Sequence, residues 1–401
     1  MATAVHEASA GMPSGEELIE RARAMIPTLK ARAAQATAQR RIPDETIAEM
    51  QAAGFFRILQ PKRWGGYEMH PNVFFEVQKL LAEGCMSTGW VYGVVGGHPY
   101  ELALFHNEAQ QEVWGENDAT LVSSSYQPVG KVERTEGGFY LSGQWGFSSG
   151  SEHCEWVLLG AMIPPAKEGD APDMRTFLVP RSDYVIEDAW HVFGLQGTGS
   201  QDIVVNRAFV PEHRTHKAVD GFMCTNPGQV ENDAPMYRLP WAQVFVRLVS
   251  SAALGGAKAA TKSAVEIMKT RISTNTGKAS KADPLLQNAI AKAWAEIDEM
   301  EVVLTRNFNA MIAHAEAGEP IPMEERTLFR YQSGSVVRRC AALVDTLLPL
   351  LGGRAVYLSS PVIQPWLDLH AARAHVANDP NNFGPDVVNA LLGEPPSFMF
   401  L

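Results

Sequence analysis

The sequence has few cysteines, no excess of basic residues and no long run of apolar residues. Its four cysteines lack the Cys-x-x-Cys spacing of zinc sites and disulfide frameworks, and this usage predicts a reducing cytoplasm. The formal charge of -11 leaves no basic surface for nucleic acid or anionic membranes. No apolar run reaches the roughly 18 residues of a membrane span, and no signal peptide is recognisable.

Metal-ligand spacing is also missing. His370 and His375 are five positions apart, which on a helix places them about 140° from each other, so they cannot share one ion. His213 and His216 lie in a proline-rich segment without a carboxylate at ligand spacing. We therefore predict no metal site.

Residues 194–199 (GLQGTG) are rich in glycine but do not have the glycine order of a dinucleotide-binding fingerprint. A β-rich run, residues 203–205, follows them where that fingerprint requires a helix. We therefore predict no nicotinamide site in this chain.

The sequence does have a clear change of hydrophobic period along its length. Residues 16–116 are helical in pattern, and the best-marked helix has Pro43 at its start, acids in its first turn and Gly54 after its end. From 119 to about 210 short β-rich runs predict an antiparallel barrel or sandwich, with Gly137-Gly138 as a hairpin turn. Helical periodicity then returns over roughly 245–272, 284–317 and 323–351.

We therefore predict an α+β fold that is mostly helical and has three parts. They are an N-terminal helical domain (residues 1–117), a central antiparallel β-barrel or sandwich (118–212), and a C-terminal four-helix bundle with a leading irregular loop (213–401). This order of parts is that of the acyl-CoA dehydrogenase fold.

Three features could carry chemistry. Residues 145–150 (WGFSSG) place an aromatic ring and two hydroxyls at the end of a predicted strand. His98 lies near the end of an apolar helix that also carries Trp90, and His375 follows a second apolar stretch. From spacing alone, each histidine is better explained as a buried, hydrogen-bonded core residue.

Taken together and in order, these and other motifs resemble the oxygenase components of two-component, flavin-dependent aromatic monooxygenases. That group contains para-hydroxyphenylacetate hydroxylase and a monooxygenase of a phenolic secosteroid, which is the nearer likeness. The resemblance runs from Pro43 to about Pro380 and is carried by residues 87–91 (STGWV), 102–105 (LALF), 112–116 (EVWGE), 123–126 (SSSY), 148–150 (SSG), 194–200 (GLQGTGS) and 375–380 (HVANDP).

The resemblance implies roles for the residues around the flavin ring. Ser149 would hydrogen-bond near flavin N5, Phe147 would lie along the ring system, and Trp90 and Ser124 would line the flavin and substrate pocket. Phe147 departs from the relatives' tryptophan, so its ring can still stack but lacks an N–H donor.

The resemblance also implies a more distant part of the cofactor site. Arg271 is similar to the family arginine that pairs with flavin phosphate, which a neighbouring subunit can supply, and a homotetramer is implied with it. The pair Gly352-Gly353 belongs to this cofactor site and suits either FMN or FAD.

The implied activity is hydroxylation of a small phenolic substrate, ortho to its hydroxyl, through a flavin C4a-hydroperoxide formed from reduced FMN or FAD and molecular oxygen. His98 and His375 match the two histidines that face the phenol. We expect His375 to be the main base and His98 to orient the substrate, although these roles can be exchanged. A separate NAD(P)H-dependent reductase would supply the reduced flavin.

Three alternatives stay open. An acyl-CoA dehydrogenase needs a carboxylate that takes the α-proton of a thioester, and the comparable segment offers His375 with only Asp379 as an acid. A relative that oxygenates nitrogen or sulfur would keep the flavin residues without needing a phenol base. A non-catalytic scaffold that retains the fold would bind no flavin.

Overall fold

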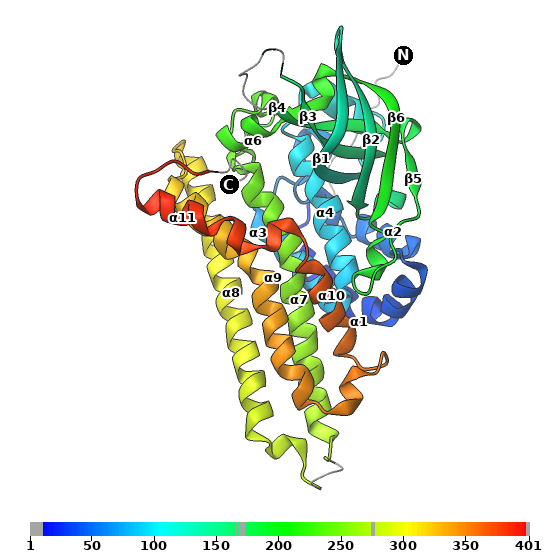
Figure 1. Cartoon of the computed structure of the whole chain (residues 1–401), viewed down its shortest axis with the longest axis vertical. Coiled ribbons are helices and arrows are strands. Elements are labelled where there is room, and N and C mark those ends of the chain that lie inside the picture. Colours follow the sequence, from blue (N-terminus) through cyan, green and yellow to red (C-terminus); the bar gives the residue numbers. More distant parts are fainter. Residues whose placement is uncertain (1–10, 166, 168–172, 274–276, 398–401) are drawn as a thin grey trace.

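The structure is a computed structural model that describes residues 11–165, 167, 173–273 and 277–397. In Figure 1 the sheet stands at the upper right and the long C-terminal helices run downward from it. The helices are α1 Gly15–Gln39, α2 Asp44–Ala52, α3 Pro71–Gly84, α4 Met86–Leu102, α5 Asn107–Trp114, α6 Ala218–Met223, α7 Trp241–Thr270, α8 Pro284–Ala317, α9 Met323–Leu350, α10 Ile363–Ala372 and α11 Gly384–Leu391. The strands are β1 Val122–Thr135, β2 Gly138–Ser148, β3 Trp156–Ile163, β4 Asp173–Pro180, β5 Val185–Glu187, β6 Gln201–Pro211 and β7 Thr215–Lys217.

The predicted α+β, mostly helical fold class is confirmed. Helix α2 begins directly after Pro43, and the chain leaves it through Gly54, whose φ of 84° favours glycine. The three long helices predicted from periodicity are α7, α8 and α9. Part of the irregular loop predicted to lead into the C-terminal bundle forms β7 and the short helix α6.

The strands form one sheet in the order β5-β6-β2-β1-β3-β4-β7. Its pairings are antiparallel as predicted, except that β1 and β3 run parallel. The reason is the short connection after β2. Strand β2 ends beside the start of β1, where Ser148 Oγ lies 3.2 Å from Ser123 Oγ. Residues 149–155 then pass the N-terminal end of β1. Strand β3 therefore begins at that end and runs parallel to β1.

The predicted hairpin between β1 and β2 is present, but its turn lies one residue earlier than expected. Thr135 pairs with Gly138, so Glu136 and Gly137 form the two-residue loop and Gly138 already belongs to β2. Gly137 has a φ of 76°, the left-handed conformation that such tight turns require.

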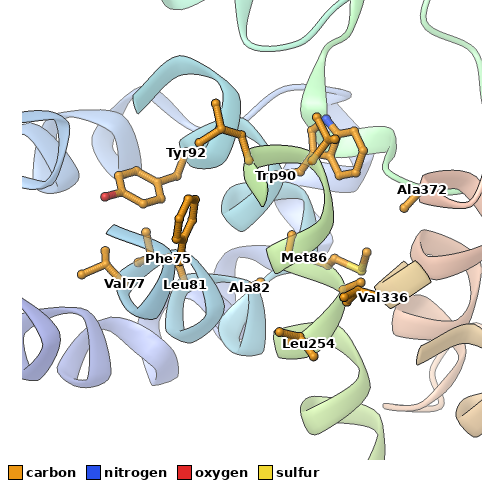
Figure 2. Close-up of a cluster of buried hydrophobic side chains, with 14 of the residues drawn as sticks. Phe75, Val77, Leu81, Ala82, Met86, Trp90, Tyr92, Leu254, Val336 and Ala372 are labelled. Atoms are coloured by element: carbon orange, nitrogen blue, oxygen red, sulfur yellow. The ribbon is translucent and has the colours of Figure 1, made fainter. Parts of the chain in front are cut away.

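Helix α4 is buried along its whole length, which is the pattern of a helix at the centre of a protein rather than at its surface. It contacts α3 and α7 on one side and β1 on the other. Figure 2 shows Tyr92 and Trp90 on different sides of the helix, with Trp90 on the side nearer Ala372 of α10. The ring of Tyr92 stacks on Phe74 of α3, 4.6 Å away between ring centroids. Polar side chains on so apolar a helix, such as His98, need a specific reason to be there.

Among the helices of the described residues, none combines the length and the apolarity that crossing a membrane requires.

Candidate active site

The end of β2 presents an aromatic ring on a strained backbone. The pairing of β2 with β6 shifts between Trp145 and Ser148, which is a β-bulge, and Phe147 within it has a φ of 67°. Trp145 is fully buried in the core of the sheet, whereas the side chain of Phe147 is 62% exposed. Positive φ is costly for a bulky residue and is found where function requires it. Alternation along the strand alone would have turned Phe147 inward.

Ser149, two residues further on, is a buried hydroxyl held from two sides. Its Oγ accepts a hydrogen bond from the indole N–H of Trp90 at 3.2 Å and lies 2.7 Å from Ser200 Oγ. Ser200 in turn lies 2.6 Å from Thr198 Oγ1. The structure therefore brings together Trp90 of α4 and Ser149, the first residue after β2. It adds Thr198 and Ser200, which the sequence suggests only as part of a resembling motif.

His98 is fully buried and bonded through both ring nitrogens. Its Nδ1 lies 2.6 Å from the carbonyl oxygen of Val122, which can only accept, so Nδ1 carries the hydrogen. Nε2, 2.8 Å from Ser124 Oγ, is then the acceptor of the neutral ring. Burial lowers the pKa of His98, while the charge of Glu101 opposes the shift. His98 and Ser124 thus form a pair in which the serine hydroxyl donates to a neutral imidazole.

His375 has the opposite tautomer. It caps the short 3-10 helix Val376–Asn378, and its Nδ1 accepts the N–H of Ala377 at 3.1 Å. In the neutral ring the hydrogen is therefore on Nε2. Burial, followed by the charge of Arg330, lowers the pKa of His375 to about 4. His375 thus offers an N–H donor, whereas His98 offers an acceptor.

Aromatic rings connect the two histidines. The ring of His375 lies 5.9 Å from that of Trp90 and 6.0 Å from that of Phe245, measured between ring centroids. Phe245 lies 5.1 Å from Tyr126, which in turn lies 6.3 Å from His98. We had not predicted Phe245 as part of the site, because nothing in the periodicity of α7 separates it from an ordinary core residue.

The hydroxyl of Tyr126 lies near Ser124, as His98 does, and it also has a carboxylate partner. It donates to the carboxylate of Glu101, which is fully buried on α4 and also lies 3.4 Å from Nδ1 of His216. Burial, and then the carboxylate, raise the pKa of the Tyr126 phenol well above its ordinary value. Tyr126 therefore stays neutral and contributes its ring to the site.

Arg271 and the glycine pair lie elsewhere. Arg271 caps the C-terminal end of α7, about 40 Å along the helix from Phe245. Its Nη1 donates to Ser280 Oγ and to the carbonyl of Leu350, each at 3.1 Å. Gly352 has a φ of 79°, a conformation that favours glycine, and it lies against the Arg271 guanidinium, whereas a Cβ on Gly353 would meet nothing within 4 Å. Within one chain, these residues are not brought to Ser149.

No three His, Cys, Asp or Glu side chains gather as a metal site within the described ranges. What the site does offer fits a flat cofactor with a polar edge. An exposed ring is held outward at Phe147, and a buried, oriented hydroxyl lies beside it at Ser149.

Comparison with known proteins points to the same kind of cofactor. Residues 13–119 match the family model described as the acyl-CoA dehydrogenase N-terminal domain, and residues 248–380 match its C-terminal domain. The oxygenase subunit of a flavin-dependent monooxygenase from Rhodococcus jostii is 39% identical over 90% of this chain and 94% of its own. The oxygenase component of an FADH2-dependent resorcinol hydroxylase from a Rhizobium species is 32% identical over 94% of this chain and 95% of its own.

Among solved structures, a 3-HSA hydroxylase from a Rhodococcus species superimposes with a TM-score of 0.91 at 36% identity, over 96% of this chain and 99% of that one. The likeness in sequence and structure therefore extends over nearly the whole length of both chains. This chain belongs to the oxygenase components of flavin-dependent monooxygenases, which are built on the acyl-CoA dehydrogenase fold.

Proposed function

We propose that this protein hydroxylates a phenolic aromatic substrate, ortho to its hydroxyl, with reduced flavin and molecular oxygen. The observation that carries the proposal is a pair of neutral histidines with opposite tautomers, His98 buried and His375 partly buried, joined by aromatic rings. When bound, the reduced flavin supplies the activation of oxygen and the transfer of one oxygen atom. The residues of this chain bind and orient the reactants and move the phenol proton.

The His98–Ser124 pair is suited to accept that proton. A phenol has a pKa of about 10, so it reacts as the stronger nucleophile only if a base shares or removes its proton. Ser124 Oγ can accept the phenol hydrogen while its own hydrogen passes to Nε2 of His98, 2.8 Å away. The Val122 carbonyl, bonded to Nδ1, stabilises the imidazolium that results.

His375 is suited to the complementary task. Its Nε2–H donates, so it can stabilise the negative charge that develops on the phenol oxygen. The hydrogen bond from Ala377 to Nδ1 favours this tautomer. We had expected His375 as the base and His98 as the orienting residue, and these hydrogen bonds favour the exchanged assignment.

For flavin, we propose that Ser149, Phe147 and Trp90 contact the ring system, and that Arg271, with Gly352-Gly353, reaches the flavin of a neighbouring subunit in a homotetramer. The roughly 40 Å of helix α7 between Phe245, in the ring cluster, and Arg271 supports a second copy. So do the exposed apolar side chains of Val356, Tyr357 and Leu358, which begin three residues after the glycine pair. A separate NAD(P)H-dependent reductase in the cytoplasm would supply reduced FMN or FAD.

The test is anaerobic mixing of the protein with reduced FMN or FAD, followed by oxygen and a panel of phenols. We expect catechol products with little hydrogen peroxide. Hydrogen peroxide alone with every phenol, together with oxygenation of a non-phenolic amine or thioether, would favour the nitrogen- or sulfur-oxygenating alternative. Bleaching of oxidised flavin by an acyl-CoA would instead favour the dehydrogenase.

The low pKa values of the two histidines predict an unusual pH profile. Burial disfavours their charged forms, so the neutral forms that the proposal requires persist at acid pH, for His375 down to about pH 4. An ordinary histidine, with a pKa of about 6.5, would be mostly protonated at pH 5. We expect the acid limb of product formation per bound flavin, measured in single turnovers, to be centred clearly below pH 6.5, because burial lowers the pKa of both histidines. An acid limb centred near pH 6.5 would contradict this expectation.

A further inference from the structure

The buried hydroxyls beside Ser149 form a chain that ends on a backbone carbonyl. Thr198 Oγ1 donates to the carbonyl oxygen of Leu195 at 2.8 Å. Ser200 Oγ lies 2.6 Å from Thr198 Oγ1, and Ser149 Oγ lies 2.7 Å from Ser200 Oγ. All three hydroxyl side chains are less than a tenth exposed, so water does not readily replace any member of the chain.

The Leu195 carbonyl gives this chain a direction. A carbonyl only accepts, and each hydroxyl has a single hydrogen. If Thr198 donates to Leu195, Ser200 must donate to Thr198, and Ser149 must donate to Ser200. In that order every hydroxyl hydrogen has an acceptor inside the protein. The indole N–H of Trp90 also points at Ser149 Oγ. Ser149 therefore has its hydrogen turned inward and faces outward as an acceptor.

The carbonyl at the end of the chain is firmly held. Leu195 has a φ of 53°, a conformation that is unfavourable for leucine and needs support from its surroundings. Its N–H donates to Oδ1 of the buried Asp368 on α10 at 2.6 Å. Its carbonyl also accepts the indole N–H of Trp190 at 2.9 Å, and Trp190 packs edge-on against Phe147.

An outward acceptor at Ser149 distinguishes the two redox states of a flavin. The N5 atom of reduced flavin carries a hydrogen that can be donated, whereas N5 of oxidised flavin has only a lone pair. We propose that Thr198 and Ser200 are specificity-determining residues: they orient the Ser149 hydroxyl as an acceptor, so that the site prefers reduced over oxidised flavin. This inference rests on the proposed contact between Ser149 and the flavin ring.

Reversing the chain is possible but unfavourable. To donate to oxidised flavin, Ser149 would have to accept a hydrogen bond from Ser200 instead of donating one to it. Ser200 would likewise have to accept a hydrogen bond from Thr198. Thr198 would then lose its hydrogen bond to the Leu195 carbonyl. The loss of one buried hydrogen bond is worth about 1 kcal/mol, which corresponds to a preference of about fivefold to tenfold.

The test compares Thr198→Val, which keeps the shape and removes the hydroxyl, with Thr198→Ser, which keeps the hydroxyl. Dissociation constants for reduced flavin, measured anaerobically, and for oxidised flavin give a ratio for each protein. We expect wild type and Thr198→Ser to prefer reduced flavin, and Thr198→Val to lower that preference about fivefold or more. General damage to the site would weaken both redox states alike and leave the ratio unchanged.

An unchanged ratio in Thr198→Val, with reduced flavin still bound, would overturn this inference and leave the proposed function intact. A wild-type protein that binds neither redox state would overturn both. Partial loss of stability in Thr198→Val does not confuse these outcomes, because the two dissociation constants are compared within one protein. Thr198→Ser is the matched control, since it keeps the hydroxyl.

Discussion

Replacing His98 by glutamine is expected to lower phenol hydroxylation by about a hundredfold or more, while flavin binding persists. Glutamine can keep hydrogen bonds in the space between Val122 and Ser124, but its amide cannot take up a proton. The phenol would then have to lose its proton to water, which the buried site restricts. Single-turnover product formation, measured with reduced flavin and a saturating phenol, gives the rate directly.

The matching change at the other histidine separates the two roles. His375→Gln keeps an N–H donor and should retain activity within about tenfold, whereas His375→Ala removes the donor and should cost about a hundredfold. His370→Gln is the control, because His370 lies on the neighbouring helix α10 but is bonded to Asp345, 2.8 Å away and outside the ring cluster. If His375→Gln were inactive and His98→Gln active, His375 would be the base, as the sequence first suggested.

The sequence predicted the long helices well: buried residues of α8 and α9 recur every three or four positions, and α7, α8 and α9 end within a few residues of the predicted limits. It predicted less well the features that depend on contacts distant in the chain. The parallel pairing of β1 and β3 follows from where β2 ends in space. The outward turn of Phe147 follows from a bulge against β6.

The candidate site was also predictable from the sequence only in part. The residues that the family motifs named, such as Trp90 and Ser149, do meet in the structure. The direction of each hydrogen bond is not encoded in the motifs. It depends on carbonyls and N–H groups far along the chain, such as those of Val122 and Ala377, and these decide which histidine accepts and which donates. Arg271 could not be placed at all by spacing, because its proposed partner lies in another copy of the chain.

Ser149→Ala is expected to uncouple the reaction: hydroxylated product per reduced flavin should fall about tenfold, and hydrogen peroxide should rise to account for the flavin consumed. Release of oxygen as hydrogen peroxide uses the hydrogen on flavin N5. An acceptor that holds this hydrogen in a dry site slows its release. Alanine removes the acceptor and leaves the indole N–H of Trp90 without its partner at 3.2 Å, while the ring of Phe147 stays in place.

Ser148→Ala is the matched control for this change. Ser148 is the adjacent residue, equally buried, but its hydroxyl bonds Ser123 at 3.2 Å instead of joining the chain to Leu195. Its removal should leave the ratio of product to hydrogen peroxide unchanged, even if the protein unfolds at a somewhat lower temperature. Equal uncoupling in both variants would show that the release of hydrogen peroxide responds to local destabilisation at the end of β2. Ser149 would then not be the acceptor of the N5 hydrogen.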